Sequence, residues 1–300
     1  MSRIDFTGRS VIVTGAGNGI GRAHAMLLAE RGAQVVVNDI GGAVDGTGAG
    51  TAAATVVDEI RAAGGIAVAS THSVADAEGG AGLVDVAISE FGRLDAVIHN
   101  AGILRDRSFA KITDADIDPV LDVHLRGAFH VLRPAWAHFI EQKYGRVLLT
   151  TSASGLLGNY GQASYAAGKA GLLGLMNVLS VEGARHGITV NALSPTAATR
   201  MTEGLLGDLA AHFDPRHVAA VAAYLVSEQC SLTHHVISAS GGRVARLFVG
   251  STQGWYGGTE PVQPEQIHEA MDQICDLDGF IVPDDGNDEV ALIRKALLGG

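Results

Sequence analysis

A tyrosine and a lysine, Tyr165 and Lys169, stand four residues apart in a stretch whose apolar pattern predicts a helix. Side chains at positions i and i+4 lie on the same face of a helix. An ammonium group near a phenol favours the phenolate, and each unit by which the tyrosine pKa falls from about 10 requires roughly 1.4 kcal/mol. The pair therefore indicates a general acid/base, although the same spacing also occurs on helix faces that do no chemistry.

A second chemical signal is a glycine-rich turn at residues 14–21, which reads Thr-Gly-Ala-Gly-Asn-Gly-Ile-Gly. The turn follows a predicted strand and opens a predicted helix. Glycines there permit a tight turn and let backbone amides approach a pyrophosphate, whose charge the helix N-terminus favours. The segment predicts a dinucleotide site, with a purely structural turn as the alternative. The residues expected to contact the cofactor are Gly15, Asn18, Gly19, Ile20 and Gly21.

Asp39 comes directly after the second predicted strand, 18 residues beyond Gly21. A carboxylate at this place can accept both hydroxyls of an adenosine ribose, and it would repel a 2′-phosphate. No arginine or lysine stands beside Asp39 in the sequence. NAD is therefore the expected cofactor rather than NADP. The alternative role for Asp39 is to cap the segment that follows it.

The elements that must position these residues alternate between short β-branched runs and longer helical patterns. Such alternation is typical of repeated βαβ units around a parallel sheet. The predicted strands span 11–14, 35–38, 66–70, 94–99, 146–150, 189–193 and 236–239, and the predicted helices 20–31, 51–63, 77–91, 114–141, 164–186 and 215–226. We expect an α/β fold with a doubly wound, Rossmann-like parallel sheet over residues 1–245. Residues 246–300, with helices predicted at 264–274 and 290–298, are expected to form a C-terminal extension packed on that domain.

The composition fits a globular chain and argues against several classes of protein. Of 300 residues, 47% are hydrophobic and 18% charged, which suffices to bury a sizeable core. A formal net charge of −11 argues against binding nucleic acid through phosphate contacts. Two cysteines make neither a disulfide framework nor a metal cluster, so a cytoplasmic protein without a metal is expected. An acidic residue near the start and the lack of a long apolar run predict neither export nor a membrane span.

Two further motifs fall in register with the turn and the Tyr/Lys pair. Asn100-Ala101-Gly102 closes the fourth predicted strand, and Ser152 lies just after the fifth, 13 residues before Tyr165. With these motifs in this order, residues 5 to about 245 resemble the short-chain dehydrogenase/reductase family. The resemblance implies that Ser152 holds the substrate oxygen, that Tyr165 exchanges the proton, and that Lys169 binds the nicotinamide ribose and lowers the Tyr165 pKa. It also implies that the cofactor is bordered by Ser73, Val74, Asn100, Ala101, Gly102, Pro195 and Thr196.

One position departs from the family pattern. Members usually carry an asparagine that supports a water and proton relay, and the aligned residue here is His124, within Val-His-Leu-Arg-Gly at 123–127. Histidine both donates and accepts hydrogen bonds, so His124 is a candidate catalytic relay residue. The alternative is a histidine that is satisfied by backbone inside its helix. Thr196 also replaces the glycine that usually follows the proline.

Several stretches resemble more closely the (3R)-hydroxyacyl-CoA dehydrogenase portions of type 2 peroxisomal multifunctional enzymes and their actinobacterial relatives. These stretches are 37–42, 102–109, 123–127 and 152–165, and the likeness continues into the C-terminal extension. The resemblance implies an oxidoreductase of lipid metabolism that acts on a 3-hydroxyacyl-CoA or a steroid-type substrate. It further implies a homo-oligomer, a dimer or tetramer, built through the helices at 114–141 and 164–186. The rival expectations are a 3-oxoacyl-carrier-protein reductase and a catalytically silent dinucleotide-binding scaffold.

Two features leave their interpretation open, and a third predicts a lid. Arg105, Arg107 and Lys111 follow the fourth predicted strand and could either contact the phosphates of a CoA thioester or form ordinary surface ion pairs. Residues 41–50 contain five glycines, which predicts either a mobile surface loop or a loop whose backbone approaches a ligand. Residues 196–214, after the sixth strand, are expected to form a lid over the substrate.

Overall fold

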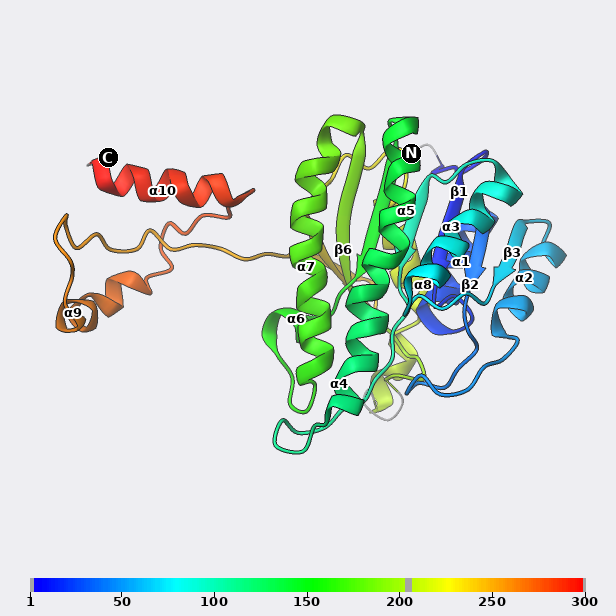
Figure 1. Ribbon diagram of the computed structural model, residues 1–300, viewed down its shortest axis with the longest axis horizontal. Helices are drawn as coiled ribbons and strands as arrows, with labels where there is room; N and C mark the ends of the chain where they lie inside the picture. The colour runs from blue at the N-terminus through cyan, green and yellow to red at the C-terminus, as the bar shows by residue number, and fades with distance from the viewer. Residues whose placement is uncertain (1–2, 203–206, 299–300) are drawn as a thin grey trace. The chain divides into compact units, whose positions relative to one another are not determined.

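The computed structural model describes residues 3–202 and 207–298 (Figure 1). The chain separates into two compact units, Met1–Arg246 and Leu247–Gly300. This division falls one residue after the boundary expected from the sequence. Residues 203–206 of the expected lid lie outside the described residues.

The first unit is built on an eight-stranded sheet in the part of the chain that the structure describes, with the strand order β3-β2-β1-β4-β5-β6-β7-β8. The strands are β1 (Ser10–Thr14), β2 (Gln34–Asn38), β3 (Ile66–Ser70), β4 (Ala96–His99), β5 (Gly145–Thr150), β6 (Ile188–Thr196), β7 (Val236–Ser240) and β8 (Arg243–Leu247). Strands β1 to β7 are joined by parallel ladders, which confirms the doubly wound α/β fold. The order reverses between β1 and β4, and ligands of such sheets bind where the carboxyl ends of the strands meet this switch point.

Helices cover both faces of this sheet (Figure 1). One face carries α1 (Gly19–Glu30), α2 (Ala52–Ala62) and α8 (Pro215–Leu225), whose apolar residues form one core with the strands. The other face carries α3 (Ala77–Phe91), α4 (Asp114–Leu121), α5 (Gly127–Gln142) and α7 (Ala163–Gly183). Because both faces are covered, the central strands are mostly apolar, and every residue of β1 and β5 is buried.

The helix predicted at 114–141 is interrupted at the centre of the fold. A π-helical turn, Asp122–Arg126, lies between α4 and α5. Single π turns inside α-helices are frequent at functional sites, because the extra residue shifts the side chains that follow it. The turn contains His124, so the position that departs from the family pattern also has an irregular backbone.

Several short elements were not expected from the sequence. They are β8, the short helix α6 (Ala153–Leu157) and the 3₁₀ turn Gly207–His212, while the predicted helix at 164–186 ends in a 3₁₀ turn, Ala184–His186. Only Gly241 and Gly242 separate β7 from β8, and both have positive φ. Two residues are too few for a crossover connection, so β8 runs antiparallel to β7. β6 also continues to Thr196, three residues beyond the predicted end.

The second unit contains α9 (Pro264–Ile274) and α10 (Gly286–Leu298). The backbone amide of Ser251 donates to the carbonyl of Ile281 over 2.9 Å, and the rings of Phe248 and Phe280 stack with centroids 5.7 Å apart. No helix among the described residues is both long and apolar enough to cross a membrane.

Candidate active site

The glycine-rich turn forms a cradle between β1 and α1. A Cβ on Gly21 would lie 2.1 Å from the carbonyl oxygen of Gly15, and a Cβ on Gly15 would lie 2.8 Å from Ala101 Cα. Gly15 also has a φ of +65°, which favours glycine. Asn18 precedes α1 without a side-chain cap, so the amides of the first turn stay available for an anionic ligand. The cradle thus fits a dinucleotide diphosphate.

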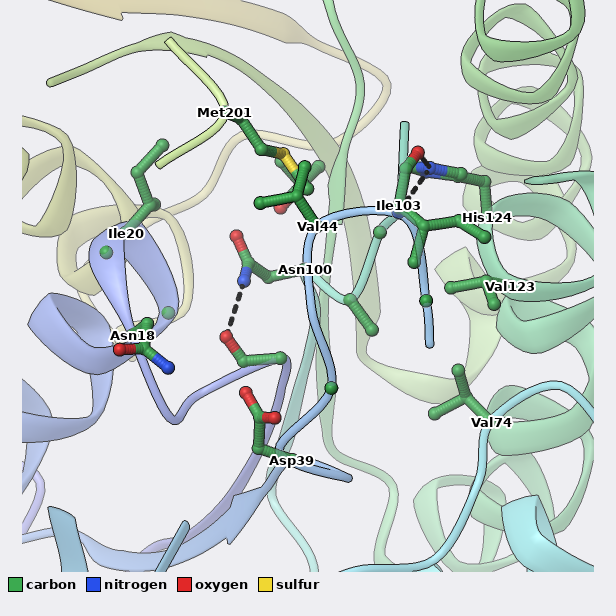
Figure 2. Close-up of a pocket in the computed structure, with 18 of the residues that line it drawn as sticks. Asn18, Ile20, Asp39, Val44, Val74, Asn100, Ile103, Val123, His124 and Met201 are labelled. Carbon is green, nitrogen blue, oxygen red and sulfur yellow. Dashed lines mark hydrogen bonds between the residues drawn. The ribbon is translucent and has the colours of Figure 1, made fainter. Parts of the chain in front are cut away.

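The Asn100-Ala101-Gly102 motif holds this cradle against the end of β4. The side-chain amide of Asn100 donates to the carbonyl oxygens of Thr14 (3.1 Å) and Gly15 (3.2 Å), and Figure 2 draws Asn100 with one such bond. The backbone amides of Asn100 and Ala101 both donate to Thr14 Oγ1, over 3.0 Å each. Asn100 therefore stabilises the turn itself, a role that its position beside a cofactor had not revealed.

Asp39 lies at the end of β2 and faces the same turn. Its Oδ2 accepts from the amide of Gly17 over 2.8 Å, and its Oδ1 accepts from the amide of Gly41 over 2.7 Å. Each carboxylate oxygen can accept two hydrogen bonds, so one lone pair on each remains available. The side chain is thus oriented by backbone and can still receive two ribose hydroxyls.

Tyr165 and Lys169 lie one turn apart near the start of α7, and Lys169 is only 3% exposed. The Lys169 ammonium donates to the carbonyl oxygen of Thr150 over 2.5 Å and lies 5.6 Å from the centre of the Tyr165 ring. Burial disfavours the charged form, which lowers the pKa of Lys169 from 10.5 to about 7. The ammonium is therefore easily deprotonated near neutral pH.

The pKa of the Tyr165 phenol differs from the expectation drawn from the sequence. Burial raises the Tyr165 pKa above 10, a hydrogen bond with the Ser152 hydroxyl opposes this, and the charge of Asp106 adds to it. The sequence predicted that Lys169 lowers this pKa. The net direction is upward because burial dominates, and because Lys169 is itself poorly charged and donates to Thr150.

Ser152 is placed by the short helix α6, which it caps. Its Oγ accepts from the amide of Ser154 over 3.2 Å, and its hydroxyl also bonds with the Tyr165 phenol. Ser154 in turn donates to the side-chain oxygen of Gln162 over 2.8 Å, immediately before α7. This chain of contacts fixes the serine against the tyrosine, although the two residues come from different helices.

His124 is 1% exposed and its ring meets the Tyr165 ring edge to face, with centroids 5.2 Å apart. Its Nε2 lies 3.0 Å from the amide nitrogen and 2.8 Å from the carbonyl oxygen of Ile103. Within the described residues, Nδ1 is buried without a partner. Burial, and next the charge of Lys169, lower the His124 pKa well below 6.5, so the ring is neutral. Backbone thus satisfies one nitrogen and leaves the other free.

These residues surround a cavity of about 470 Å³ (Figure 2). Among the sequence-predicted residues, the cavity is lined by Gly15, Asn18, Gly19, Ile20, Gly21, Asp39, Ser73, Val74, Asn100, Ala101, Gly102, His124, Tyr165, Lys169 and Pro195. Ser152 is not among the lining residues, but it bonds with Tyr165, which lines the cavity. Thr196 is exposed and does not line the cavity, because β6 continues through it and successive side chains of a strand point to opposite faces.

Part of the lining was expected only as whole segments, the loop at 41–50 and the lid at 196–214, and part was not expected. Residues of those segments in the lining include Gly42, Ala43, Val44, Gly46, Arg200, Met201 and Thr202, whereas Ile40, His72 and Ile103 were not predicted. The loop at 41–50 is attached to the chain after β4, since Leu104 donates its amide to the Val44 carbonyl over 3.0 Å. The five glycines of this loop were the available signal, and they favour the interpretation in which its backbone approaches a ligand.

The basic residues after β4 have different surroundings in the structure. Arg105 lines the cavity, and its guanidinium donates to the carbonyl oxygens of Asp45 (3.0 Å) and Ala115 (2.7 Å). Arg107 forms an ion pair with Asp116 at 3.0 Å and does not line the cavity. The described residues contain no group of three or more potential metal ligands.

A model of the short chain dehydrogenase family matches residues 9–208. The short-chain type dehydrogenase/reductase Rv0148 of Mycobacterium tuberculosis is 49% identical over 273 residues, which are 90% of this chain and 95% of that protein. Peroxisomal multifunctional enzyme type 2 of Mus musculus is 46% identical over 286 residues, which cover 94% of this chain and 38% of the mouse protein.

A solved structure agrees with these sequence relatives. The structure of full-length peroxisomal multifunctional enzyme type 2 from Drosophila melanogaster matches with a TM-score of 0.85 and 36% identity. The match covers 99% of this chain and 50% of the fly protein. The chain therefore spans 38% of the mouse enzyme and half of the fly enzyme.

Proposed function

The chain belongs to the short-chain dehydrogenase family, and from this we propose that it is an NAD-dependent oxidoreductase that interconverts a secondary alcohol and a ketone. The observation that carries the proposal is the contact of Ser152 and Lys169 with Tyr165 beside the cradle at α1. A catalytically silent scaffold would need the cradle alone. The presence of all three side chains in contact favours catalysis.

In the proposed mechanism, Ser152 donates a hydrogen bond to the substrate oxygen and Tyr165 exchanges the proton. During oxidation, the Tyr165 phenolate removes the proton of the alcohol, and in the reverse direction the phenol returns it to the ketone. Lys169 would hold the nicotinamide ribose with its ammonium. The nicotinamide supplies the hydride chemistry when it is bound. His124, whose Nδ1 is free within the described residues, would pass protons between the site and solvent.

The preference for NAD over NADP rests on Asp39. Its two carboxylate oxygens are already oriented by the amides of Gly17 and Gly41. A 2′-phosphate at this place would meet a negative charge that cannot easily turn away. This argument also disfavours the rival 3-oxoacyl-carrier-protein reductase, for which NADPH is the expected reductant.

We propose a 3-hydroxyacyl-CoA as the substrate, with a steroid-type alcohol or CoA ester as the next candidate. Support comes from relatives whose names describe peroxisomal multifunctional enzymes and hydratase-dehydrogenase-epimerases. Arg105 is a candidate contact for the CoA phosphates because it lines the cavity, although two of its nitrogens already donate to carbonyls. Arg107 is a weaker candidate because Asp116 already pairs with it.

The assembly that we propose is a homo-oligomer built through α5 and α7. Both helices expose large apolar side chains, Phe129 and Ile140 on α5 and Val178 and Val181 on α7. Light scattering would measure the expected dimer or tetramer. We also propose that residues 246–300 form a C-terminal extension and that the protein acts in the cytoplasm, where its two free cysteines would stay reduced.

The test is an initial-rate assay that follows NADH absorbance with NAD or NADP, on (3R)-hydroxyacyl-CoAs, a steroid alcohol and a steroid CoA ester. We expect turnover with NAD on the CoA esters. Tyr165→Phe should keep NADH binding and lose turnover, and a near-normal rate would refute the assigned acid/base. Arg105→Ala should raise KM for an acyl-CoA more than for the matching acyl-pantetheine, which lacks the nucleotide phosphates. Equal effects on the two KM values would show that Arg105 supports the loop at 41–50 and does not contact the CoA phosphates.

A further inference from the structure

Lysine and arginine line the described part of the cavity at three positions, Arg105, Lys169 and Arg200. The ammonium of Lys169 donates to Thr150, and the guanidinium of Arg105 donates to two carbonyl oxygens. Arg200 differs from both. Its side chain is exposed and, within the described residues, has neither an ion pair nor a hydrogen bond. It is therefore the cavity cation that is free to meet a ligand.

The backbone that carries Arg200 is nevertheless fixed. The amide of Thr199 donates to Thr202 Oγ1 over 2.9 Å, and the amide of Met201 donates to Thr199 Oγ1 over 3.2 Å. Thr202 Oγ1 then donates to the carbonyl of Ala197 over 2.7 Å. These bonds form a tight turn at 199–202 with Arg200 near its tip. A free side chain on an ordered turn can bind without a large entropy cost for the backbone.

This turn lies against the first residue of α1. A Cβ added to Gly19 would lie 3.1 Å from Thr199 Cγ2. Figure 2 draws Met201, two residues after Thr199, on the same side of the cavity as Asn18 and Ile20. Arg200 therefore belongs to a turn that lies beside the N-terminus of α1, and it also lines the cavity.

We propose that Arg200 binds the diphosphate of the dinucleotide together with the first-turn amides of α1, an inference that rests on the proposed function. A diphosphate carries two negative charges, and a chain with a net charge of −11 must supply the opposing charge locally. The nearby Arg22 of α1 is paired with Glu59. The planar guanidinium of Arg200 can donate two hydrogen bonds to phosphate oxygens, which strengthens and orients the contact.

A CoA thioester also carries a diphosphate, so the same guanidinium could meet either ligand. The contact of Thr199 with Gly19 favours the dinucleotide, because Gly19 belongs to the cradle that holds its phosphates. Arg105 stands on the chain after β4 and is the cation better placed for a second anionic ligand. The two arginines thus have separable roles.

The experiment is a fluorescence titration of NADH without substrate, in which ADP-ribose and adenosine compete for the site. Arg200→Gln keeps the side-chain length and removes the charge. Arg216→Gln is the matched control, since Arg216 is 86% exposed, pairs with Asp214 and does not line the cavity. We expect Arg200→Gln to weaken NADH and ADP-ribose binding about tenfold, to leave adenosine binding nearly unchanged, and to reduce the dependence of Kd on salt. Arg200→Lys should be intermediate, and Arg216→Gln should match the wild type.

Equal NADH affinity in Arg200→Gln and wild type would overturn the inference. If that variant instead raised KM for an acyl-CoA and not for the acyl-pantetheine, Arg200 would belong to the CoA phosphates. An equal loss of adenosine affinity would show that the turn, rather than the charge, had been damaged, and would also overturn it. The proposed function is tested separately by the wild type, since a wild-type protein that bound no NADH would refute the dinucleotide site itself.

Discussion

Gly102 lies so close to the His124 ring that we expect a side chain at position 102 to destabilise the protein. A Cβ on Gly102 would lie 2.3 Å from His124 Cε1 and 3.1 Å from each ring nitrogen. His124 cannot move aside freely, because it is 1% exposed and its Nε2 is held by Ile103. Inserting a methyl group into such packing typically costs about 1–3 kcal/mol. We expect Gly102→Ala to destabilise the protein by this amount.

A double-mutant cycle tests this clash, because its second pair of proteins lacks the His124 ring. His124→Ala is destabilising by itself, because it empties a buried site, but it leaves room for the new methyl group. In that background Gly102→Ala should cost almost nothing, so the two substitutions should be non-additive by about 1–3 kcal/mol. For chains of 150–250 residues, each kcal/mol shifts Tm by roughly 2–4 °C. The expected difference between the backgrounds is therefore about 2–12 °C.

The assay is thermal unfolding of the four proteins without cofactor, because Gly102 also borders the proposed cofactor site. All are measured at one protein concentration, which keeps any effect of oligomerisation constant. Gly174→Ala is the control, since Gly174 lies in α7 with nothing within 4 Å of a new Cβ, and it should be neutral or slightly stabilising. An equal cost of Gly102→Ala in both backgrounds would refute the steric account.

Two further predictions concern buried titratable groups. Lys169 has its pKa lowered from 10.5 to about 7, so the unfolded chain binds more protons between these values and the stability contribution rises with pH from 7 to 10.5. Lys169→Met should flatten this rise in a urea titration repeated at several pH values, and an unchanged slope would contradict it. His24 is buried, has no partner for either ring nitrogen within the described residues, and has a pKa lowered to about 3. Stability should thus fall as pH decreases from 6.5 to 3, and His24→Leu should reduce that loss of Tm, whereas an identical acid limb would exclude His24 as its source.

Much of the fold could be predicted because its signals are local. The strand at 66–70 and the helix at 264–274 were predicted with the bounds that the structure has. Both are short periodic runs ended by turn residues, so neighbouring residues suffice to define them. The π turn at Asp122–Arg126 and the strand β8 were missed, because their signals are weak in the sequence and they depend on contacts within the fold.

The candidate site also contains features that local sequence predicts and features that depend on the folded chain. The glycine turn and the Tyr165/Lys169 pair are each defined by spacing within one element, and spacing is visible in a sequence. Arg200 could not be singled out, because its significance depends on the turn at 199–202 lying against α1 and on the pairing of the other cavity cations. The direction of the Tyr165 pKa was also missed, since burial is a property of the folded chain.

The raised pKa of Tyr165 affects the proton exchange that we propose for this site. Burial disfavours the Tyr165 phenolate, and Asp106, which accepts from the Gln162 side chain over 2.8 Å, adds a negative charge nearby. Lys169 gives limited help, because its own pKa is only about 7. The protein by itself therefore keeps the phenol protonated, ready to donate to a ketone. The proposed oxidation of an alcohol requires the phenolate, which has to form against this burial.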